Sequence, residues 1–162
     1  MTEVTIRWAR ASDAKTLAAI GHAAWKRGNA NNLPEEVQNR VTADVFENFA
    51  VTQPDNILIA EKDDHVLGFA AAANGENIVT DLWVNKADEG QGIGRRLLEE
   101  MENELVKRGH EDVKLEVLTS NTRTLGLTKY RGYHVTSRGL RMDATLSLPL
   151  HKTEVSKRLI GA

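Results

Sequence analysis

The stretch ADEGQGIGRRLL, residues 87–98, places three alternating glycines directly before an apolar run with helical spacing. The first amides of a helix point at the preceding turn and attract anions, and glycines let a ligand approach the backbone closely. The stretch therefore predicts a tight turn into a helix, either with a bound anion or as a plain connection. The apolar side of that helix consists of Ile93, Leu97, Leu98, Met101 and Leu105, before Gly109.

Two familiar phosphate-binding patterns do not fit this turn. A dinucleotide fingerprint G-x-G-x-x-G that begins at Gly90 or Gly92 would need its third glycine at Arg95 or Leu97. The phosphate loop G-x-x-x-x-G-K-[ST] is absent, because two arginines follow the last glycine. The anion reading therefore depends on the backbone amides alone.

Arg95 and Arg96 stand in the first helical turn, where cations oppose the helix dipole at a cost of about 0.3–1 kcal/mol each. A bound polyphosphate would reverse the sign of that effect. Alternatively, both arginines pair with Glu99 and Glu100 one turn later, on a solvated face. The sequence leaves the two interpretations open.

The chain has 162 residues, of which 21 are basic, 23 are acidic and none is cysteine. The length predicts one domain, and the balanced charge gives no reason to expect nucleic acid or a membrane as partner. No disulfide, thiolate metal site or cysteinyl intermediate can form. Residues 1–10, MTEVTIRWAR, indicate neither a signal peptide nor a membrane span, so we expect a cytoplasmic protein.

Strand-like and helix-like patterns alternate along the chain and predict an α/β or α+β fold. Two of the strands, separated by Lys62-Asp-Asp-His65, form a hairpin. The expected strands are Val4–Trp8, Ile57–Glu61, Val66–Ala72, Asn77–Val84, Val113–Leu118, Tyr133–Ser137 and Leu140–Leu146. The expected helices run from Ser12 to Trp25, from Pro34 to near Gln53 through Val37, Val41, Val45 and Phe49, from Ile93 to Lys107, and from about Asn121 to Arg131.

With LWV before it and LEVLTSNTRTLGLTKYRGY after it, EGQGIGRRLL resembles the GNAT superfamily of acyl-CoA-dependent N-acetyltransferases. The family pattern [QR]-x-x-G-x-[GA] falls on Glu89 to Gly94, and the asparagine that opens the next helix falls on Asn121. The resemblance implies one GNAT-type domain over residues 1–162. Only the tail, residues 149–162, lies outside the part of the chain that carries the resemblance. The resemblance also implies a mixed, mostly antiparallel central sheet of about six to seven strands, flanked by about four helices.

The resemblance implies acetyl-CoA as co-substrate and assigns residues to its binding. The strand at Leu82, Trp83 and Val84 would bond the pantetheine arm, and its splaying from the next strand would open the cofactor slot. Asn121 would also bond the pantetheine. The acceptor would enter from the opposite side, beneath the loop 28–33. The pyrophosphate would lie on the amides of Gln91, Gly92, Ile93, Gly94 and Arg95.

Two positions depart from the family pattern. Glu89 stands where Gln or Arg is usual, which places a carboxylate near the expected phosphates. Thr128 stands seven residues after Asn121, where the family usually has the tyrosine that protonates the departing thiolate. Tyr130 lies roughly 200° around the helix from that position and would point away. We expect the thiolate to meet a hydroxyl or water, or to leave unprotonated.

The reaction needs a base to take a proton from the attacking amine, and a carboxylate is the usual kind. By position, Asp81 and Glu116 are the candidates, and for each the alternative is a solvent-facing strand residue. Trp25 and Trp83 could wall the acceptor pocket or belong to the core. The five histidines, His22, His65, His110, His134 and His151, show no paired metal spacing, so we expect no metal.

We therefore expect direct transfer of an acetyl group from acetyl-CoA to a primary amine. The acceptor could be a small amine, an amino acid, an antibiotic-like polyamine or a protein N-terminus. A covalent route is disfavoured, because no serine lies in a G-x-S-x-G turn. The rivals are a catalytically weak acyl-CoA-binding module and a nucleotide-binding domain unrelated to CoA. Leu146, Leu148 and Leu150 in the tail favour a paired or covered strand edge over a terminal helix, and a homodimer is possible.

Overall fold

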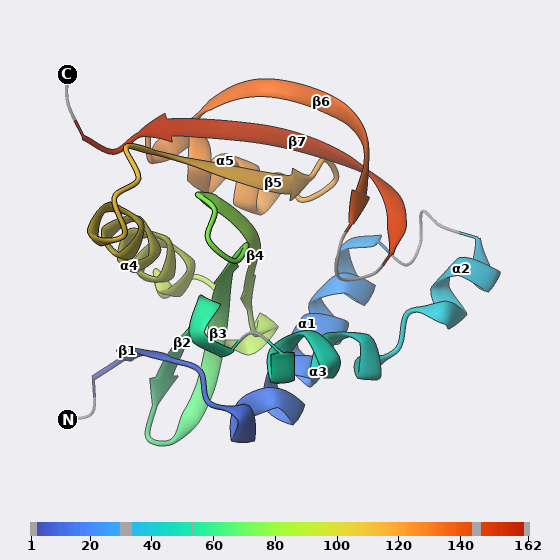
Figure 1. Cartoon of the computed structure of the whole chain (residues 1–162). Helices are drawn as coiled ribbons and strands as arrows, with labels where there is room; N and C mark the ends of the chain where they lie inside the picture. The colour runs from blue at the N-terminus through green and yellow to red at the C-terminus, as the bar shows by residue number, and fades with distance from the viewer. Residues whose placement is uncertain (1–2, 30–33, 53, 144–146, 161–162) are drawn as a thin grey trace.

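A seven-stranded mixed sheet forms the centre of the protein (Figure 1), in the order β1-β2-β3-β4-β5-β7-β6. The computed structural model describes residues 3–29, 34–52, 54–143 and 147–160. Neighbouring strands are antiparallel except β4 and β5, which run parallel, so the expected mixed, mostly antiparallel sheet is confirmed. The strands are β1 (Thr5–Trp8), β2 (Ile57–Lys62), β3 (His65–Ala72), β4 (Ile78–Val84), β5 (Asp112–Leu118), β6 (His134–Asp143) and β7 (Leu148–Arg158).

Five α-helices surround the sheet in the described part of the chain. In Figure 1, α4 lies on one side of β2, β3 and β4, and α1 and α3 lie on the other. The helices are α1 (Ala14–Asn29), α2 (Glu35–Arg40), α3 (Ala43–Thr52), α4 (Ile93–Lys107) and α5 (Thr122–Tyr130), with short 3-10 turns η1 (Ala11–Asp13), η3 (Pro54–Asn56) and η4 (Lys86–Asp88).

Strand β2 is buried on both faces, which explains its uninterrupted apolar sequence. Ile57 and Ile59 belong to the core beneath α1 and α3, whereas Leu58 and Ala60 belong to the core beneath α4. Successive strand residues point to opposite faces, so a strand between two helical layers needs apolar residues at every position. The centre of the sheet is therefore held from both sides.

The single helix expected from Pro34 to near Gln53 is wrong, because the chain forms two helices, α2 and α3. Val41 leaves helical geometry with φ −95° and ψ 103°. Its side chain is still buried, against Trp25 and Phe46, and its carbonyl oxygen accepts a hydrogen bond from His22 Nε2 at 3.0 Å. The regular apolar spacing thus predicted correctly that Val41 is buried. It predicted wrongly that one helix continues through this residue.

The expected last two strands are also wrong, because residues 134–143 form one strand, β6, and the tail forms another. Strand β7 lies between β5 and β6 and pairs with both, from Asp112↔Arg158 to Leu118↔Lys152 on one side. The tail is therefore a strand with both edges paired, as its alternating leucines favoured, and not a terminal helix. Leu146 lies outside the described residues. The position of β7 is determined by its pairing with β5 and β6, and the local sequence pattern of the tail gives no information about these partners.

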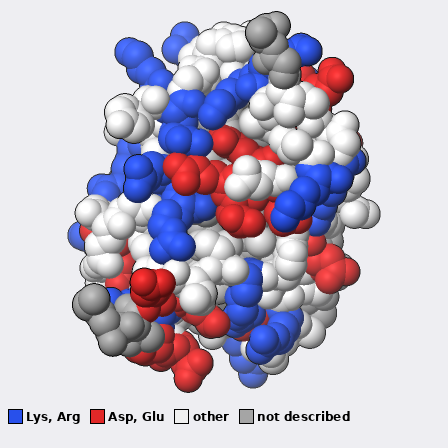
Figure 2. Space-filling model, turned by 90° about the vertical axis from the view of Figure 1, so that its left-hand side faces the viewer, with Lys and Arg blue, Asp and Glu red and all other residues white. Residues whose placement is uncertain are grey.

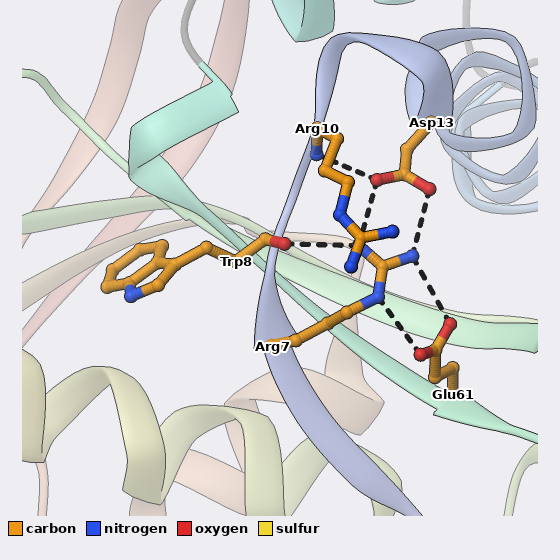
Figure 3. A network of polar contacts seen from close by, with 5 residues as sticks. All are labelled: Arg7, Trp8, Arg10, Asp13 and Glu61. Carbon is orange, nitrogen blue, oxygen red and sulfur yellow. Dashed lines mark hydrogen bonds and ion pairs between the residues drawn. The ribbon is translucent and has the colours of Figure 1, made fainter.

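Arg7 ties the edge strand β1 to the rest of the fold (Figure 3). Its guanidinium donates to both carboxylate oxygens of Asp13, at 2.9 and 3.0 Å, and to both of Glu61, at 3.0 and 3.2 Å. Asp13 also accepts the backbone N–H of Arg10 at 2.7 Å. The hydrogen bonds from Arg7 and from the Arg10 backbone hold the pKa of the Asp13 carboxyl below its usual value.

We predict that Asp13→Asn lowers the free energy of unfolding by about 1 kcal/mol at pH 7, because a partly buried charged pair is lost. The folded-state pKa of Asp13 lies below 3.8, so this stabilisation is complete above that pH and disappears as the pH falls through the folded-state value. Urea unfolding from pH 7 to pH 3 measures the difference. Asp64→Asn in the exposed β2–β3 turn is the control and should change little; a constant difference across the pH range would contradict the prediction.

Candidate active site

Strands β4 and β5 separate after only two residue pairs, Ile78↔Lys114 and Val79↔Leu115. Beyond Val79, each strand keeps its other neighbour: β4 stays paired with β3, and β5 stays paired with β7. The splaying that the sequence implied is therefore present. It leaves the facing backbone edges of both strands available to a ligand.

A β-bulge at Thr80 directs the side chains of β4. Ala71 lies opposite Asp81, whereas Ala72 lies opposite Val79, so Thr80 is the extra residue. The bulge resets the alternation of the strand. As a result, Val79 and Leu82 both face the core beneath α4, while Asp81 contacts Trp83, which packs on the opposite face.

The first cavity, which we call the slot, opens between β4 and β5 at the N-terminus of α4. It is lined by eight of the nine residues that the sequence assigned to cofactor binding. Those eight are Leu82, Trp83, Val84, Gly92, Ile93, Gly94, Arg95 and Asn121; Gln91 does not line the slot. The residues expected around a cofactor are thus brought together by the fold.

The glycine turn prepares the N-terminus of α4 for an anion. Gly90 and Gly92 have φ of 83° and 77°, which residues with a side chain rarely adopt. Gly92 is the N-cap and supplies no side-chain acceptor, so the first amides of α4 have no side-chain cap. These amides lie along the slot, where they can bind an anionic group.

Arg95 and Arg96 do not pair with Glu99 or Glu100 in the described chain. Glu99 instead pairs with Arg131, at 3.1 Å. Arg95 lines the slot, and its Nη2 lies close to Gly92. Of the two interpretations, the arrangement favours the one in which Arg95 faces an anion.

Two further arginines border the slot. Arg123 on α5 pairs with Glu89 at 3.1 Å, so the carboxylate at the unusual motif position is balanced by a local cation. Arg27 at the end of α1 donates from Nη2 to the Val84 carbonyl oxygen at 3.1 Å. Neither arginine was singled out from the sequence, because the contacts connect separate elements.

A second cavity, which we call the inner cavity, adjoins the slot; the space in it that a water molecule's centre can occupy is about 40 Å³. The two cavities share five lining residues, so they meet at one point of the sheet. The shared residues are Leu82, Trp83, Leu118, Asn121 and Thr124. Trp25 and Trp83 both line the inner cavity and also pack against the core clusters.

Asp81 lies in the inner cavity within a network of neutral donors. Thr80 Oγ1 donates to Asp81 Oδ2 at 2.9 Å, and Trp83 Nε1 donates to Oδ1 at 3.2 Å. Burial raises the pKa of Asp81 to about 6, the nearby Asp143 carboxylate adds to the rise, and the two hydrogen bonds and Lys152 oppose it. A carboxylate with such a pKa can accept a proton near neutral pH.

Glu116 also lines the inner cavity, between two cations. Its carboxylate lies 3.9 Å from Arg141 and 3.7 Å from Lys152, and Lys152 lies 3.1 Å from Asp143. In the described chain Asp81 has no cation within 4 Å. The geometry therefore separates the two candidate bases: Glu116 belongs to an ion-pair network, and Asp81 faces the cavity through neutral partners.

Thr128 is not brought to either cavity. It is 1% exposed, and its hydroxyl donates to the Leu125 carbonyl oxygen at 2.9 Å within α5. Tyr130 is 82% exposed and lines neither cavity, as the helical spacing indicated. A hydroxyl that the sequence analysis missed, Thr124, lines both cavities. The acceptor loop 28–33 lies largely outside the described residues.

The model of the Acetyltransferase (GNAT) family matches residues 7–133. The chain belongs to the GNAT acetyltransferase family. This match confirms the resemblance to the GNAT superfamily and the prediction of an acetyltransferase enzyme. The matched region contains the slot and Asp81 but ends before β6 and β7.

Solved structures share this GNAT fold at low sequence identity. The chain is similar to yncA of Salmonella typhimurium, solved with acetyl-CoA, with 20% identity and a TM-score of 0.73. The match covers 99% of this chain and 96% of the Salmonella chain. The chain is similar to paia N-acetyltransferase of Thermoplasma acidophilum, solved with coenzyme A, with 19% identity and a TM-score of 0.79. The match covers 96% of this chain and 99% of the Thermoplasma chain. It is also similar to ribosomal-protein-alanine N-acetyltransferase of Brucella melitensis, with 20% identity and a TM-score of 0.71. That match covers 95% of this chain and 99% of the Brucella chain. Among curated proteins, none matches the sequence.

The surface of this GNAT protein mixes both charges where Figure 2 shows it. An acidic band crosses the middle of that face and basic side chains border it, so no single-sign surface extends across it. Within the described ranges, no helix is long and apolar enough to cross a membrane. The same residues contain no group of three or more His, Asp or Glu side chains that could hold a metal ion.

We predict that Gly68→Ala destabilises the protein by at least about 2 kcal/mol, because an overpacked strand contact must shift the backbone. A Cβ at Gly68 would lie 2.5 Å from the Trp83 carbonyl oxygen, on the strand that forms the slot. Chemical denaturation measures the change. Gly126→Ala in α5, where a Cβ meets nothing within 4 Å, is the matched control and should stabilise by about 0.5–1 kcal/mol. Equal effects of the two changes would contradict the packing argument.

Proposed function

We propose that this GNAT protein transfers an acetyl group from acetyl-CoA directly to a primary amine, with Asp81 as the general base. The observation that carries the proposal is the junction of the two cavities at Leu82, Trp83 and Asn121. One cavity ends on uncapped helix amides and Arg95, and the other contains a carboxylate of raised pKa. A thioester in the slot would thus meet an amine from the inner cavity.

The slot suits acetyl-CoA along its length. The α4 amides and Arg95 would hold the pyrophosphate. The free edge of β4 would bond the pantetheine amides, as one strand bonds another. Asn121 Oδ1 accepts the Thr124 N–H at 3.1 Å and caps α5, which turns the amide Nδ2 into the donor left for the pantetheine. Similar structures from Salmonella typhimurium and Thermoplasma acidophilum contain acetyl-CoA and coenzyme A.

The reaction forms a C–N bond and breaks the C–S bond of the thioester. An uncharged amine attacks the thioester carbonyl carbon, and Asp81 takes the proton that the nitrogen loses, directly or through a water. CoA leaves as a thiolate. Thr124 lines both cavities, and in this proposal its hydroxyl would donate a hydrogen bond to that sulfur. A thiol has an ordinary pKa of about 8.5, so its anion leaves without a strong acid.

Binding and turnover separate this proposal from its rivals. Acetyl-CoA at about 100 times its Kd should add roughly 2.7 kcal/mol of stability, which a thermal shift detects. Release of free thiol with an amine panel measures transfer, and the protein contributes no thiol background because it has no cysteine. Absence of a thermal shift would contradict both the acetyltransferase and the acyl-CoA-binding module, because each requires the protein to bind acetyl-CoA. A shift without thiol release would favour an acyl-CoA-binding module, for which the buried position of Thr128 is the supporting observation.

We predict that Asp81→Asn lowers kcat/KM by about 10²- to 10⁴-fold, because a general base contributes that range. In the unchanged protein the rate should rise with pH through about 6, the pKa of Asp81, and this acidic limb should vanish in the variant. Thr128→Ala is the comparison and should reduce turnover only modestly. A large loss for Thr128→Ala, or an unchanged acidic limb for Asp81→Asn, would contradict these roles.

The same variant has a second readout that does not depend on activity. A carboxyl whose folded-state pKa is raised from 3.8 to about 6 loses folding free energy as the pH rises between those values. Above pH 6, Asp81→Asn should therefore be more stable than the unchanged protein, by about 1–2 kcal/mol. Urea unfolding at pH 5 and pH 8 measures this trend, and equal stability differences at both values would contradict it.

A further inference from the structure

The inner cavity carries an excess of negative charge. Three carboxylates line it, from Asp81, Glu116 and Asp143, against one cation, Lys152. The formal sum of these lining side chains is −2 when all are ionised. Just outside the lining, Arg141 and Glu154 lie 3.6 Å apart and balance each other, so they do not change the sum.

The structure already contains an alkylammonium group in this cavity. The Lys152 side chain is 7% exposed, and its Nζ lies 3.1 Å from Asp143 Oδ2 and 3.7 Å from Glu116 Oε2. A buried ammonium is stable only beside such partners. Asp143 and Glu116 thus form a position that accepts a primary ammonium on a flexible chain, which the Lys152 side chain itself now fills.

Aromatic rings complete the wall. Trp25 and Phe46 come from α1 and α3, and Trp83 comes from β4. Aromatic faces attract cations and exclude water, and they offer nothing favourable to a carboxylate. Rings combined with surplus carboxylates are the arrangement that recognises organic cations.

We propose that the acceptor is an alkyl diamine, with its reacting nitrogen at Asp81 and its second, protonated nitrogen at Asp143 and Glu116. This inference rests on the proposed acetyl transfer. Asp143 and Lys152 lie on β6 and β7, beyond residues 7–133 that the family model matches. Acceptor selection is therefore performed by strands outside the matched region, while the slot lies within it.

Three acceptors of four carbons each test the charge directly: 1,4-diaminobutane, butylamine and 4-aminobutanoate. They share a 3-aminopropyl group and differ only at the fourth carbon, which carries an ammonium, is a methyl or is a carboxylate. The expected order of kcat/KM follows that sequence, with the diamine about tenfold or more above butylamine, since each 1.4 kcal/mol of charge attraction is a factor of ten. Equal rates, or a preference for 4-aminobutanoate, would overturn the proposal.

Two variants move the selectivity in opposite directions. Asp143→Asn should lower the ratio of diamine to butylamine kcat/KM severalfold, because one carboxylate charge is removed. Lys152→Met should raise that ratio, because the resident ammonium no longer competes for Asp143 and Glu116. Glu76→Gln, an exposed charge change in the β3–β4 turn, is the matched control and should leave the ratio unchanged. The same direction of change in Asp143→Asn and Lys152→Met would contradict the assignment.

Calorimetric titration with CoA present separates failure of this inference from failure of the proposed function. Tighter binding of 1,4-diaminobutane than of butylamine, without thiol release from acetyl-CoA, would contradict acetyl transfer and support the cationic pocket. Thiol release with no preference between the two amines, in turnover and in binding, would support acetyl transfer and overturn the diamine. The Asp143→Asn and Lys152→Met ratios can also be measured by this titration if turnover is absent.

Discussion

The separation of β4 from β5 after two residue pairs is the constraint on which the site depends. A gap in a sheet exposes backbone donors and acceptors and is normally costly. Here each strand stays anchored on its other side, β4 by β3 and β5 by β7, so the sheet remains continuous through two halves. The unpaired edges then provide hydrogen bonds for a ligand, and both cavities open where the strands part.

The bulge at Thr80 connects that gap to the chemistry. It turns Asp81 away from the α4 core, and Trp83 and Thr80 hold the carboxylate by hydrogen bonds. Burial raises the pKa of Asp81 to about 6, which would suit it to the proposed role as a base; the same burial penalises its ionisation, so the ionised group reduces stability above that pH. In the proposed reaction the glycine turn and Asp81 would thus serve the two reactants from separate elements, through cavities that meet at one junction.

The two cavities draw on different parts of the chain. The slot is built from β4, the glycine turn, α4 and the start of α5, all inside the region that the GNAT model matches. The charged end of the inner cavity uses Asp143 and Lys152 from β6 and β7. In the proposed reaction the first part would bind acetyl-CoA and the second would select the acceptor, so the two tasks would fall to different segments of the chain.

Local pattern alone determined the hairpin of β2 and β3, the amphipathic α4 and the glycine turn, because periodicity and positive-φ positions are properties of neighbouring residues. The break at Val41 and the insertion of β7 between β5 and β6 were decided by partners distant in sequence. The same holds for the site. Asp81 could be named from its place before the turn, but the tertiary structure placed Asp143 and Lys152 beside it and buried Thr128 away from it, since burial and charge pairing exist only once the chain has folded.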